Sequence, residues 1–507
     1  MVLAVIKIQK LKSMNNTTAS NQEARDLELH QIKQKTVSGA ISYFLRTLFL
    51  QGFGLGSAII LSWLLDPEDF GVYGFVIQII GILTFISDIG FAAALIQKKQ
   101  NPTLTDYRTT FTVQQILSWI IVALVLLLLA TGLVSQKAGT AANWILLSLA
   151  LSFPLASLKT ISSVMLERRL DFSRLVLPQI VEQVLFHSIL IWMAWNGYGA
   201  LSYAYAIIAR SIIGTAVMLY ISPWSIGFAY NKQAFWELFG FGAKFQVNDF
   251  LARIKDQLFF LALGLVLPIR EFGYIQWAKN WSLYPYMLTV QNVMAITFPT
   301  FSRLQHDRQL LGRAIEKSLY FISLFVFPIL VGMIVFIGPS LAVIPAYAKW
   351  QPATFAFIWF TASVFWSALS TPLTNTLNAI GKINATLKLM VMWTTLTWVL
   401  TPIALWAWGY TGVAFAAFVI SCTSFVTVRM VNREVPFRFL LSVGKQTFAA
   451  AAMLLVGLLG WEIWHHGTVE LLGGMIITSA TYGTVFLAIG WKQFWVEVAS
   501  LRALRKN

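Results

Sequence analysis

The sequence predicts an all-α polytopic membrane protein with about 14 transmembrane helices, arranged as two six-helix lobes plus two C-terminal helices. Composition is the first reason: 57% of the 507 residues are hydrophobic and 11% are charged, whereas a soluble chain carries about a quarter charged residues. The second reason is a series of long apolar segments. The third is a short polar phrase that occurs once in each half, which indicates a duplicated bundle.

The apolar segments are each long enough for the roughly 20 residues that cross a bilayer core. They must be helices, because open strands leave backbone groups unsatisfied in lipid. In order, they lie near 39–64, 70–96, 111–134, 143–165, 175–196, 199–221, 245–267, 272–299, 315–337, 353–379, 384–408, 410–431, 446–465 and 470–491.

Basic residues alternate between the loops, and this alternation orients the helices. The alternate loops with little positive charge hold little more than Lys137, Arg270 and Lys349. By the positive-inside rule the basic loops and both termini are cytoplasmic. This distribution accounts for the net charge of +16 without a nucleic-acid partner. The basic set is Lys98, Lys99, Arg108, Arg168, Arg169, Arg174, Arg303, Arg308, Arg313, Lys382, Arg433 and Arg438.

The duplication is visible in two pairs of phrases. Asp69-Phe70-Gly71 follows a proline, and so does Glu271-Phe272-Gly273; the turn Trp195–Ala200 before the sixth segment resembles Trp408–Val413 before the twelfth. Segments one to six then correspond to seven to twelve. Because each copy has an even number of helices, both copies have the same orientation in the membrane, which predicts a repeat axis along the membrane normal. Chance recurrence of aromatic-glycine turns at membrane surfaces is the alternative.

These observations divide the chain into five parts. They are a polar cytoplasmic tail at 1–37, an N-lobe at 38–222, a cytoplasmic linker at 223–243, a C-lobe at 244–432, and the last two helices with a basic cytoplasmic C-terminus at 433–507.

Several charges lie inside predicted N-lobe helices, where each costs at least about 2.5 kcal/mol unless it is paired or hydrated. Arg210 is near the middle of the sixth segment. Arg46 and Asp88 lie at similar depth from the cytoplasmic ends of their segments, so they can pair, and Glu182 is a competing partner. A structural salt bridge and a functional role are equally good interpretations. Lys159 is close enough to its helix end to snorkel.

The seventh segment is the most polar. Gln246, Asp249, Arg253 and Asp256 share one helical face, and such a stripe should line a hydrated cavity rather than face lipid. Lys279 in the eighth segment adds a cation among tryptophans and tyrosines. Cations with aromatics suit a pyrophosphate and sugar rings, although an ordinary interfacial aromatic belt is the simpler interpretation of the aromatics.

The chain also resembles a known family. Leu65-Asp66-Pro67-Glu68-Asp69-Phe70-Gly71, Asp88-Ile89-Gly90-Phe91-Ala92-Ala93-Ala94-Leu95-Ile96-Gln97 and Glu167-Arg168-Arg169-Leu170-Asp171-Phe172 are similar to the polysaccharide transporter family. These are Wzx-type flippases, near the colanic-acid exporter branch of the MATE-like multidrug/oligosaccharidyl-lipid/polysaccharide superfamily. Further matches are Phe241-Gly242-Ala243-Lys244, Phe298–Gln305 and Leu377–Lys382, and the resemblance covers residues 36–490.

The resemblance implies a non-enzymatic flippase of the bacterial cytoplasmic membrane, with two MATE-like lobes rocking around a cavity and no cofactor. Its partners would be a polyprenyl-pyrophosphate-linked oligosaccharide, membrane lipid and other polysaccharide-assembly proteins. We expect four cations to bind the anionic head group and four carboxylates to pair with them or couple to an ion gradient. The cations are Arg46, Arg210, Arg253 and Lys279; the carboxylates are Asp88, Glu182, Asp249 and Asp256.

Two other functions stay open. A drug antiporter with the same fold would need an acidic cavity. A polytopic glycosyltransferase or polymerase could use Asp66-Pro67-Glu68-Asp69 as a metal-binding acidic pair, but Pro with Asp is ordinary turn chemistry and the equivalent turn of the second half has only Glu271. The histidines show no metal-ligand spacing, and the sequence holds no nucleotide-binding loop of the Gly-Lys-Ser/Thr type.

Overall fold

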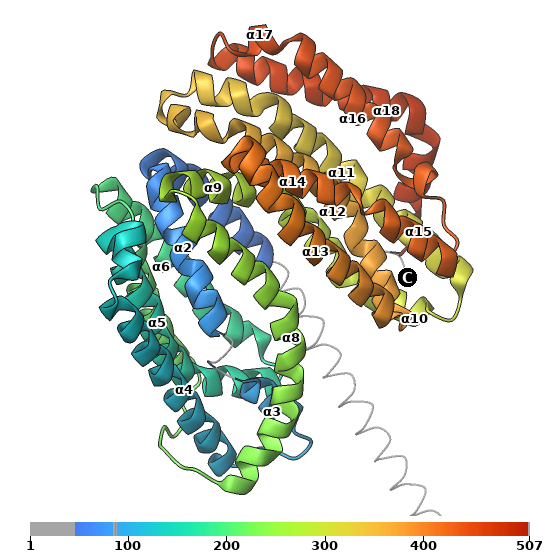
Figure 1. Ribbon diagram of the computed structural model, residues 1–507. Coiled ribbons are helices and arrows are strands. Elements are labelled where there is room, and N and C mark those ends of the chain that lie inside the picture. Colours follow the sequence, from blue (N-terminus) through green and yellow to red (C-terminus); the bar gives the residue numbers. More distant parts are fainter. Residues whose placement is uncertain (1–45, 85–86, 88, 505–507) are drawn as a thin grey trace, which may run out of the picture.

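Helices make up all the regular structure in the described part of the chain. The computed structural model describes residues 46–84, 87 and 89–504, with the side chains of 241–255, 296, 492–493 and 496–504 left aside. The predicted tail at 1–37 and Asp88 therefore lie outside the described residues. The helical prediction is confirmed for the rest (Figure 1).

The helices follow one another with short connections. In order they are α1 (Arg46–Leu64), α2 (Pro67–Leu83), α3 (Phe91–Gln97), α4 (Leu104–Ala130), α5 (Leu133–Arg168), α6 (Phe172–Trp195), α7 (Leu201–Ile221), α8 (Lys232–Val266), α9 (Ile269–Tyr286), the π-helix η2 (Met287–Gln291), α10 (Asn292–Leu304), α11 (Arg308–Val343), the 3₁₀-helix η3 (Pro345–Ala353), α12 (Thr354–Ala379), α13 (Ile383–Trp408), α14 (Tyr410–Cys422), α15 (Phe425–Glu434), α16 (Phe439–Leu459), α17 (Trp461–Trp464) and α18 (Thr468–Leu504).

Eleven helical stretches of the described chain are long and apolar enough to cross a membrane. The predicted segment at 70–96 is divided into α2 and α3, with positive φ at Ile89 and Gly90. The segment at 272–299 is interrupted by η2, and the one at 245–267 carries the polar stripe of α8. The chain is a multi-pass membrane protein, but a count of 14 spans stays a prediction because these three segments are broken or charged.

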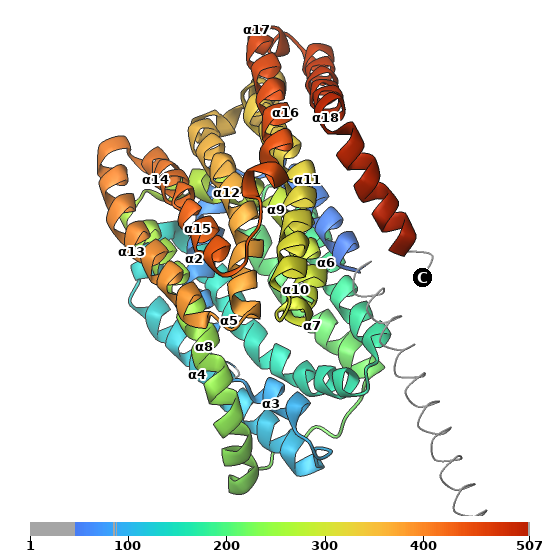
Figure 2. The same ribbon diagram turned by 90° about the vertical axis from the view of Figure 1, so that its right-hand side faces the viewer.

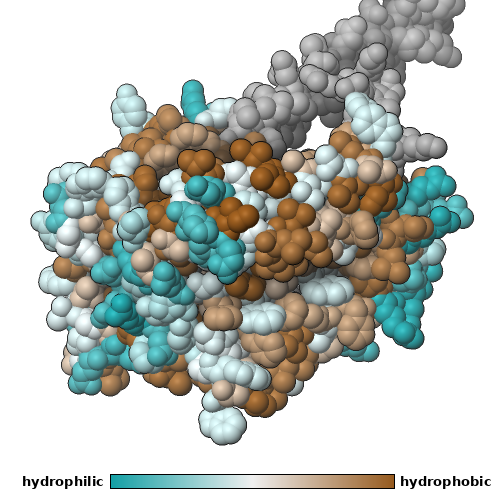
Figure 3. Space-filling view, turned by 90° about the horizontal axis from the view of Figure 1, so that it is seen from above, coloured by the Kyte–Doolittle hydropathy of each residue, from teal (hydrophilic) through white to brown (hydrophobic). Residues whose placement is uncertain are grey.

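Large apolar side chains cover the outside of the molecule. Tyr220 and Trp406 are each 89% exposed, and Leu127 is 67% exposed. A soluble protein rarely leaves large contiguous apolar patches in water, whereas in a bilayer they face lipid tails. The space-filling view from the side of α17 shows hydrophobic residues interspersed with hydrophilic patches (Figure 3).

The second half repeats the helix packing of the first. In the first half α4 packs on α5, and both α5 and α6 pack on α7; in the second half α11 packs on α12, and both α12 and α13 pack on α14. This is the pattern that duplication of segments one to six predicts. The helices α16 and α18 pack on α11 at the outside of the second half (Figure 2). The lobe boundaries themselves stay a prediction.

The first helix of each half lies between the two halves. On its own side α1 contacts α6, where the Trp63 and Trp195 ring centroids are 6.0 Å apart. On the other side Trp277 of α9 donates a hydrogen bond to the Ser62 hydroxyl at 2.9 Å. In the same way α8 contacts both α2 and α9.

The two halves meet where α2 crosses α9, and glycine makes the crossing possible. A Cβ on Gly71 would lie 2.0 Å from the carbonyl oxygen of Ile269, and one on Gly273 would lie 1.8 Å from that of Pro67. Any side chain here would force the two backbones apart. These glycines belong to the duplicated phrases, so the repeat marks the interface between the halves. We call the end of the molecule that holds Pro67 and Pro268 the crossing end.

Alanine at either crossing glycine should destabilise the protein, because a backbone carbonyl cannot move aside as a flexible side chain can. We expect Gly71→Ala or Gly273→Ala to lower the free energy of unfolding by roughly 1–3 kcal/mol, the usual range for overpacking. Thermal unfolding of the purified protein in detergent measures the effect. Gly56→Ala on α1, where a Cβ would meet nothing within 4 Å, is the control, and equal melting temperatures for all three variants would contradict the interpretation.

Candidate functional site

The deep charges of the first half are paired or stacked. Lys159 of α5 forms an ion pair with Glu182 of α6, and their side chains are 23% and 21% exposed. The expectation that Lys159 snorkels to its helix end is therefore wrong, because a carboxylate on the neighbouring helix lies within its reach. Glu182 also packs against Gly214 of α7, where a Cβ would lie 2.2 Å from its Cγ.

Arg210 lies on α7 beside an aromatic ring. Its guanidinium carbon is 4.6 Å from the centroid of Phe186 on α6, a cation–π contact that partly replaces water around a half-buried charge. His187, which follows Phe186 on α6, makes an edge-to-face contact with Phe53 on α1, with ring centroids 5.7 Å apart. His187 was not predicted as a site residue, since a lone histidine in an apolar segment has no spacing partner.

Four of the predicted site residues cannot be assigned contacts. Arg46 is the first described residue of α1 and is half-buried, but its proposed partner Asp88 lies outside the described residues. Asp249 and Arg253 lie within α8, and their side chains are not described. The Arg46–Asp88 pair and the full polar stripe of α8 therefore stay predictions.

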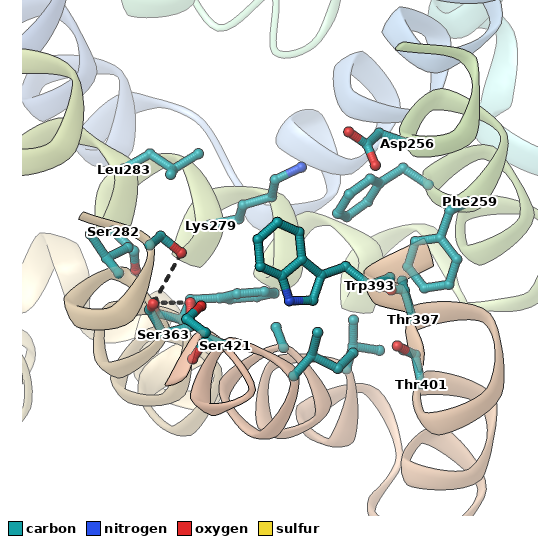
Figure 4. Close-up of a pocket in the computed structure, with 18 of the residues that line it drawn as sticks. Asp256, Phe259, Lys279, Ser282, Leu283, Ser363, Trp393, Thr397, Thr401 and Ser421 are labelled. Atoms are coloured by element: carbon teal, nitrogen blue, oxygen red, sulfur yellow. Dashed lines mark hydrogen bonds between the residues drawn. The ribbon is translucent and has the colours of Figure 1, made fainter. Parts of the chain in front are cut away.

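A polar cavity of about 400 Å³ lies within the second half. It is bounded by α8, α9, α12, α13 and α14, and Asp256 and Lys279 both line it (Figure 4). The Nζ of Lys279 is 3.4 Å from the ring centroid of Phe260, a cation–π contact. Trp393 of α13 projects into the cavity beside Lys279 (Figure 4).

Hydroxyl groups contribute to this cavity's wall, and several of them donate their proton to a carbonyl of their own helix. Ser363 donates to the Phe360 carbonyl, Thr397 to that of Trp393 and Ser421 to that of Phe418. The remaining lone pairs of these oxygens can accept hydrogen bonds from a ligand. The wall was missed at the sequence level, although Ser363, Ser367 and Ser370 share one face of α12; the complete list of hydroxyl residues is Ser282, Ser363, Ser367, Ser370, Thr397, Thr401, Ser421 and Ser424.

An apolar cavity of about 710 Å³ lies on another face of α9. The face of α9 that carries Lys279 and Ser282 borders the polar cavity, and the face that carries Trp277, Trp281 and Tyr284 borders the apolar one. The apolar wall is completed by helices α1, α11, α12, α16 and α18, with side chains such as Leu55, Ile59, Ile329, Met333, Phe336, Met453 and Met475.

Two of the predicted cations, Lys279 and Arg210, lie in different halves of the described structure. Lys279 and Asp256 share the cavity of the second half, whereas Arg210 and Glu182 lie on neighbouring helices of the first half. A ligand that contacts both groups would have to span the space between the halves.

The acidic turn before α2 has a structural role. The Asp69 carboxylate accepts hydrogen bonds from the backbone N–H of Asp66 at 2.9 Å and of Ala200 at 2.7 Å, and the Asp66 carboxylate is 3.4 Å from the Lys349 ammonium. These contacts match the turn interpretation of the sequence. Among the described residues, no group of three or more His, Cys, Asp or Glu side chains could hold a metal ion.

Arg168, from the family-like turn after α5, anchors the opposite end of the first half. Its guanidinium donates to the carbonyls of Leu95, Ile96 and Lys98, at 2.7 to 2.9 Å. The Lys98 ammonium in turn lies 3.1 Å from Asp106 and 3.1 Å from Glu237 of α8. Burial would lower the pKa of Lys98, but these two carboxylates outweigh it and raise the pKa above its ordinary value.

Comparison with known proteins places this chain among polysaccharide-assembly proteins. Residues 60–354 match the family described as Polysaccharide biosynthesis protein. The succinoglycan biosynthesis transport protein ExoT of Rhizobium meliloti is 21% identical over 56% of this chain and 57% of its own length. The lipopolysaccharide biosynthesis protein WzxC of Escherichia coli is 22% identical over 60% of this chain and 62% of its own. The chain thus spans about three-fifths of the length of these curated relatives.

Solved structures with a similar fold include two kinds of transporter. The inward closed conformation of the lipid II flippase MurJ superposes with a TM-score of 0.71 over 90% of this chain and 100% of its own, at 16% identity. An inward-facing multidrug resistance MATE family transporter gives a TM-score of 0.57 over 75% of this chain and 94% of its own, at 13% identity. At these identities the likeness shows a shared fold.

Removing one member of the Lys159–Glu182 pair should destabilise the protein more than removing both, because it leaves an uncompensated charge in a partly buried position. We expect Glu182→Gln to lower the free energy of unfolding by about 1–3 kcal/mol, below the range for fully buried pairs since both side chains keep some exposure. The double variant Lys159→Met/Glu182→Gln should recover part of this loss. Thermal unfolding in detergent completes the double-mutant cycle, and strictly additive losses would rule out the pairing.

Proposed function

The chain belongs to the polysaccharide biosynthesis protein family, and we propose that it is a transporter of lipid-linked oligosaccharides. It moves polyprenyl-pyrophosphate-linked repeat units from the inner to the outer leaflet of the bacterial cytoplasmic membrane by alternating access. In this proposal the chain performs no catalytic step. Both family relatives are named for polysaccharide biosynthesis, one of them as a transport protein.

The observation that carries the proposal is the pair of cavities along α9. One cavity is polar, lined by Lys279 and hydroxyl oxygens, and the other is larger and almost wholly apolar. A lipid-linked oligosaccharide has the same two parts, a charged and hydroxylated head and a long hydrocarbon tail. A cavity pair that separates these parts by one helix suits such an amphiphile.

The chemistry of the polar cavity fits the head group. The Lys279 ammonium can bind a pyrophosphate oxygen through charge-assisted hydrogen bonds, and Asp256 offsets its charge when no substrate is present. Sugar hydroxyls can donate to the serine and threonine oxygens whose own protons are engaged along their helices. Arg210, a second predicted cation, lies on α7 of the first half and lines neither cavity, so a head group would have to extend beyond the polar cavity to reach it.

The charge asymmetry of the loops supports the orientation used in this proposal. By the positive-inside rule, the basic loops at the end opposite the crossing favour a cytoplasmic position for that end and for both termini. The glycine crossing then lies at the outer face and closes it, so the substrate enters from the cytoplasm and leaves after the crossing end has opened. Other polysaccharide-assembly proteins would supply and receive the repeat unit.

A drug antiporter of the same fold is the competing function. It would need a cavity suited to organic cations, yet this cavity places an ammonium group beside its acidic residue. A glycosyltransferase is a poorer fit, because Asp66 and Asp69 are engaged in contacts that hold the turn. The observations therefore favour an anionic substrate.

Deletion of the gene in its host tests the proposed function. We expect complete repeat units to accumulate on the polyprenyl carrier at the cytoplasmic face, with loss of surface polysaccharide, measured by mass spectrometry of extracted lipids. Shortened or unpolymerised glycans would point to an enzyme instead, and unchanged glycans with new drug sensitivity would point to an antiporter.

Substitution of the cavity lysine tests its role in that function. Lys279→Ala should lower export by roughly 10- to 100-fold, the factor that corresponds to a charged hydrogen bond of 1.5–3 kcal/mol, while Lys279→Arg should keep part of it. Surface polysaccharide in the complemented deletion strain is the measurement, with protein abundance checked by blotting. Arg308→Ala, at the exposed start of α11, is the charge control; equal export by both alanine variants would disprove the role.

A further inference from the structure

We propose that Lys137 and Lys349 are the gating residues of the crossing end: a reciprocal pair of latches that hold it closed and must release before it opens. The inference rests on the proposed function, because only alternating access requires this end to open. The latches deepen that function by naming the contacts that keep the outer face shut.

Each lysine reaches from one half to the other. The Nζ of Lys137 on α5 donates to the carbonyl oxygens of Leu265 and Leu267, both at 2.8 Å. The Nζ of Lys349 on η3 donates to the carbonyl oxygen of Trp63 at 2.8 Å and lies 3.4 Å from Oδ1 of Asp66. The first contact joins the first half to the end of α8, and the second joins the second half to the end of α1.

The acceptors explain why a lysine is used. Leu265 and Leu267 lie at the C-terminal end of α8, and Trp63 lies in the last turn of α1. The last carbonyls of a helix have no partner within it, and they form the negative end of the helix dipole. An ammonium group satisfies two such oxygens and complements the dipole with one side chain.

The two latches occupy equivalent places in the duplicated packing. Lys137 lies in a short helical turn that ends at Gly139, whose φ of 76° and ψ of 173° interrupt α5. Lys349 lies in the short helix η3 directly before α12, and α12 corresponds to α5 in the repeated packing. These lysines are two of the few basic residues at an end where the loops otherwise avoid positive charge, and a specific contact accounts for both.

The contact between η3 and α1 is buried at one end and exposed to solvent at the other. Trp350 is fully buried and donates to the carbonyl of Ser62 at 2.7 Å, and Tyr347 donates to that of Ile59 at 2.8 Å. The Lys349 side chain is 21% exposed and that of Asp66 is 74% exposed. Water can therefore compete for the hydrogen bonds of Lys349 more easily than for those of Trp350. The lysine contact is then the first of these contacts to break.

A buried reporter at the crossing end measures whether the latches hold it shut. Ser62 is completely buried, and its hydroxyl accepts hydrogen bonds from Trp277 and Trp281. In a Cys422→Ser background, which removes the native thiol, Ser62→Cys is a nearly isosteric reporter. The measurement is its rate of reaction with a membrane-impermeant maleimide added outside intact cells.

We expect Lys137→Met and Lys349→Met each to raise the labelling rate about tenfold, the factor that corresponds to the lower limit for a charged hydrogen bond. The double variant should label faster still, and Lys→Arg at either position should restore slow labelling. Arg270→Met is the control, because Arg270 is an exposed cation at the same end without an ion pair in the described chain. Labelling in the Lys→Met variants no faster than in this control would overturn the proposal.

A reversible cross-link tests the other claim of the proposal, that the lysine contacts must be released before transport can occur. Asp66→Cys and Lys349→Cys joined by a cleavable bis-maleimide should block surface polysaccharide export, and cleavage should restore it. Export that continues after complete cross-linking would overturn the gating role. The labelling assay does not depend on a glycan. If the Lys→Met variants label faster but deletion of the gene leaves glycans unchanged, the gating role of the lysines stands and the proposed substrate is wrong.

Discussion

The close approach of two backbones at Gly71 and Gly273 is the constraint on which the rest of the structure depends. Glycine has no Cβ, so α2 and α9 can come into backbone contact at one end of the molecule, and the contact leaves no room for a Cβ at either position. That contact positions η3 over the end of α1 and the start of α5 over the end of α8, where the two lysines find their acceptors. It also fixes α9 as the common wall of the polar and apolar cavities.

A second constraint is the scarcity of water inside the helix bundle. Among the described residues, three cations within the helices lie beside specific partners: Lys159 has a carboxylate, while Arg210 and Lys279 each lie against an aromatic ring. The difference between these partners bears on function. An ion pair is already neutral, whereas a cation held over a ring keeps its charge available for an anionic ligand. This contrast separates Arg210 and Lys279 from Lys159, although Asp256 also lines the cavity that holds Lys279.

Much of this arrangement follows from local sequence patterns, and part of it does not. The repeated phrases at Asp69 and Glu271 predicted a duplication, and their glycines proved to be the contact between the copies. The serines of α12 went unnoticed, because single hydroxyls in an apolar helix normally bond to their own backbone and become a cavity wall only when other helices leave space beside them. Lys159 was misjudged for the same reason, since its carboxylate partner lies on a different helix.

By itself the sequence determined the class of protein, the helical architecture and the repeated turns that begin α2 and α9. These properties follow from hydropathy, loop charge and turn residues, which act over a few neighbouring residues. Only the tertiary structure decided which charges meet, which faces enclose the two cavities, and that Lys137 and Lys349 reach across between the halves. Such contacts depend on how helices that are distant in the chain rotate and cross. Because lipid tails are as apolar as a helix interface, the sequence of an apolar helix hardly shows which of its faces contacts lipid and which contacts protein.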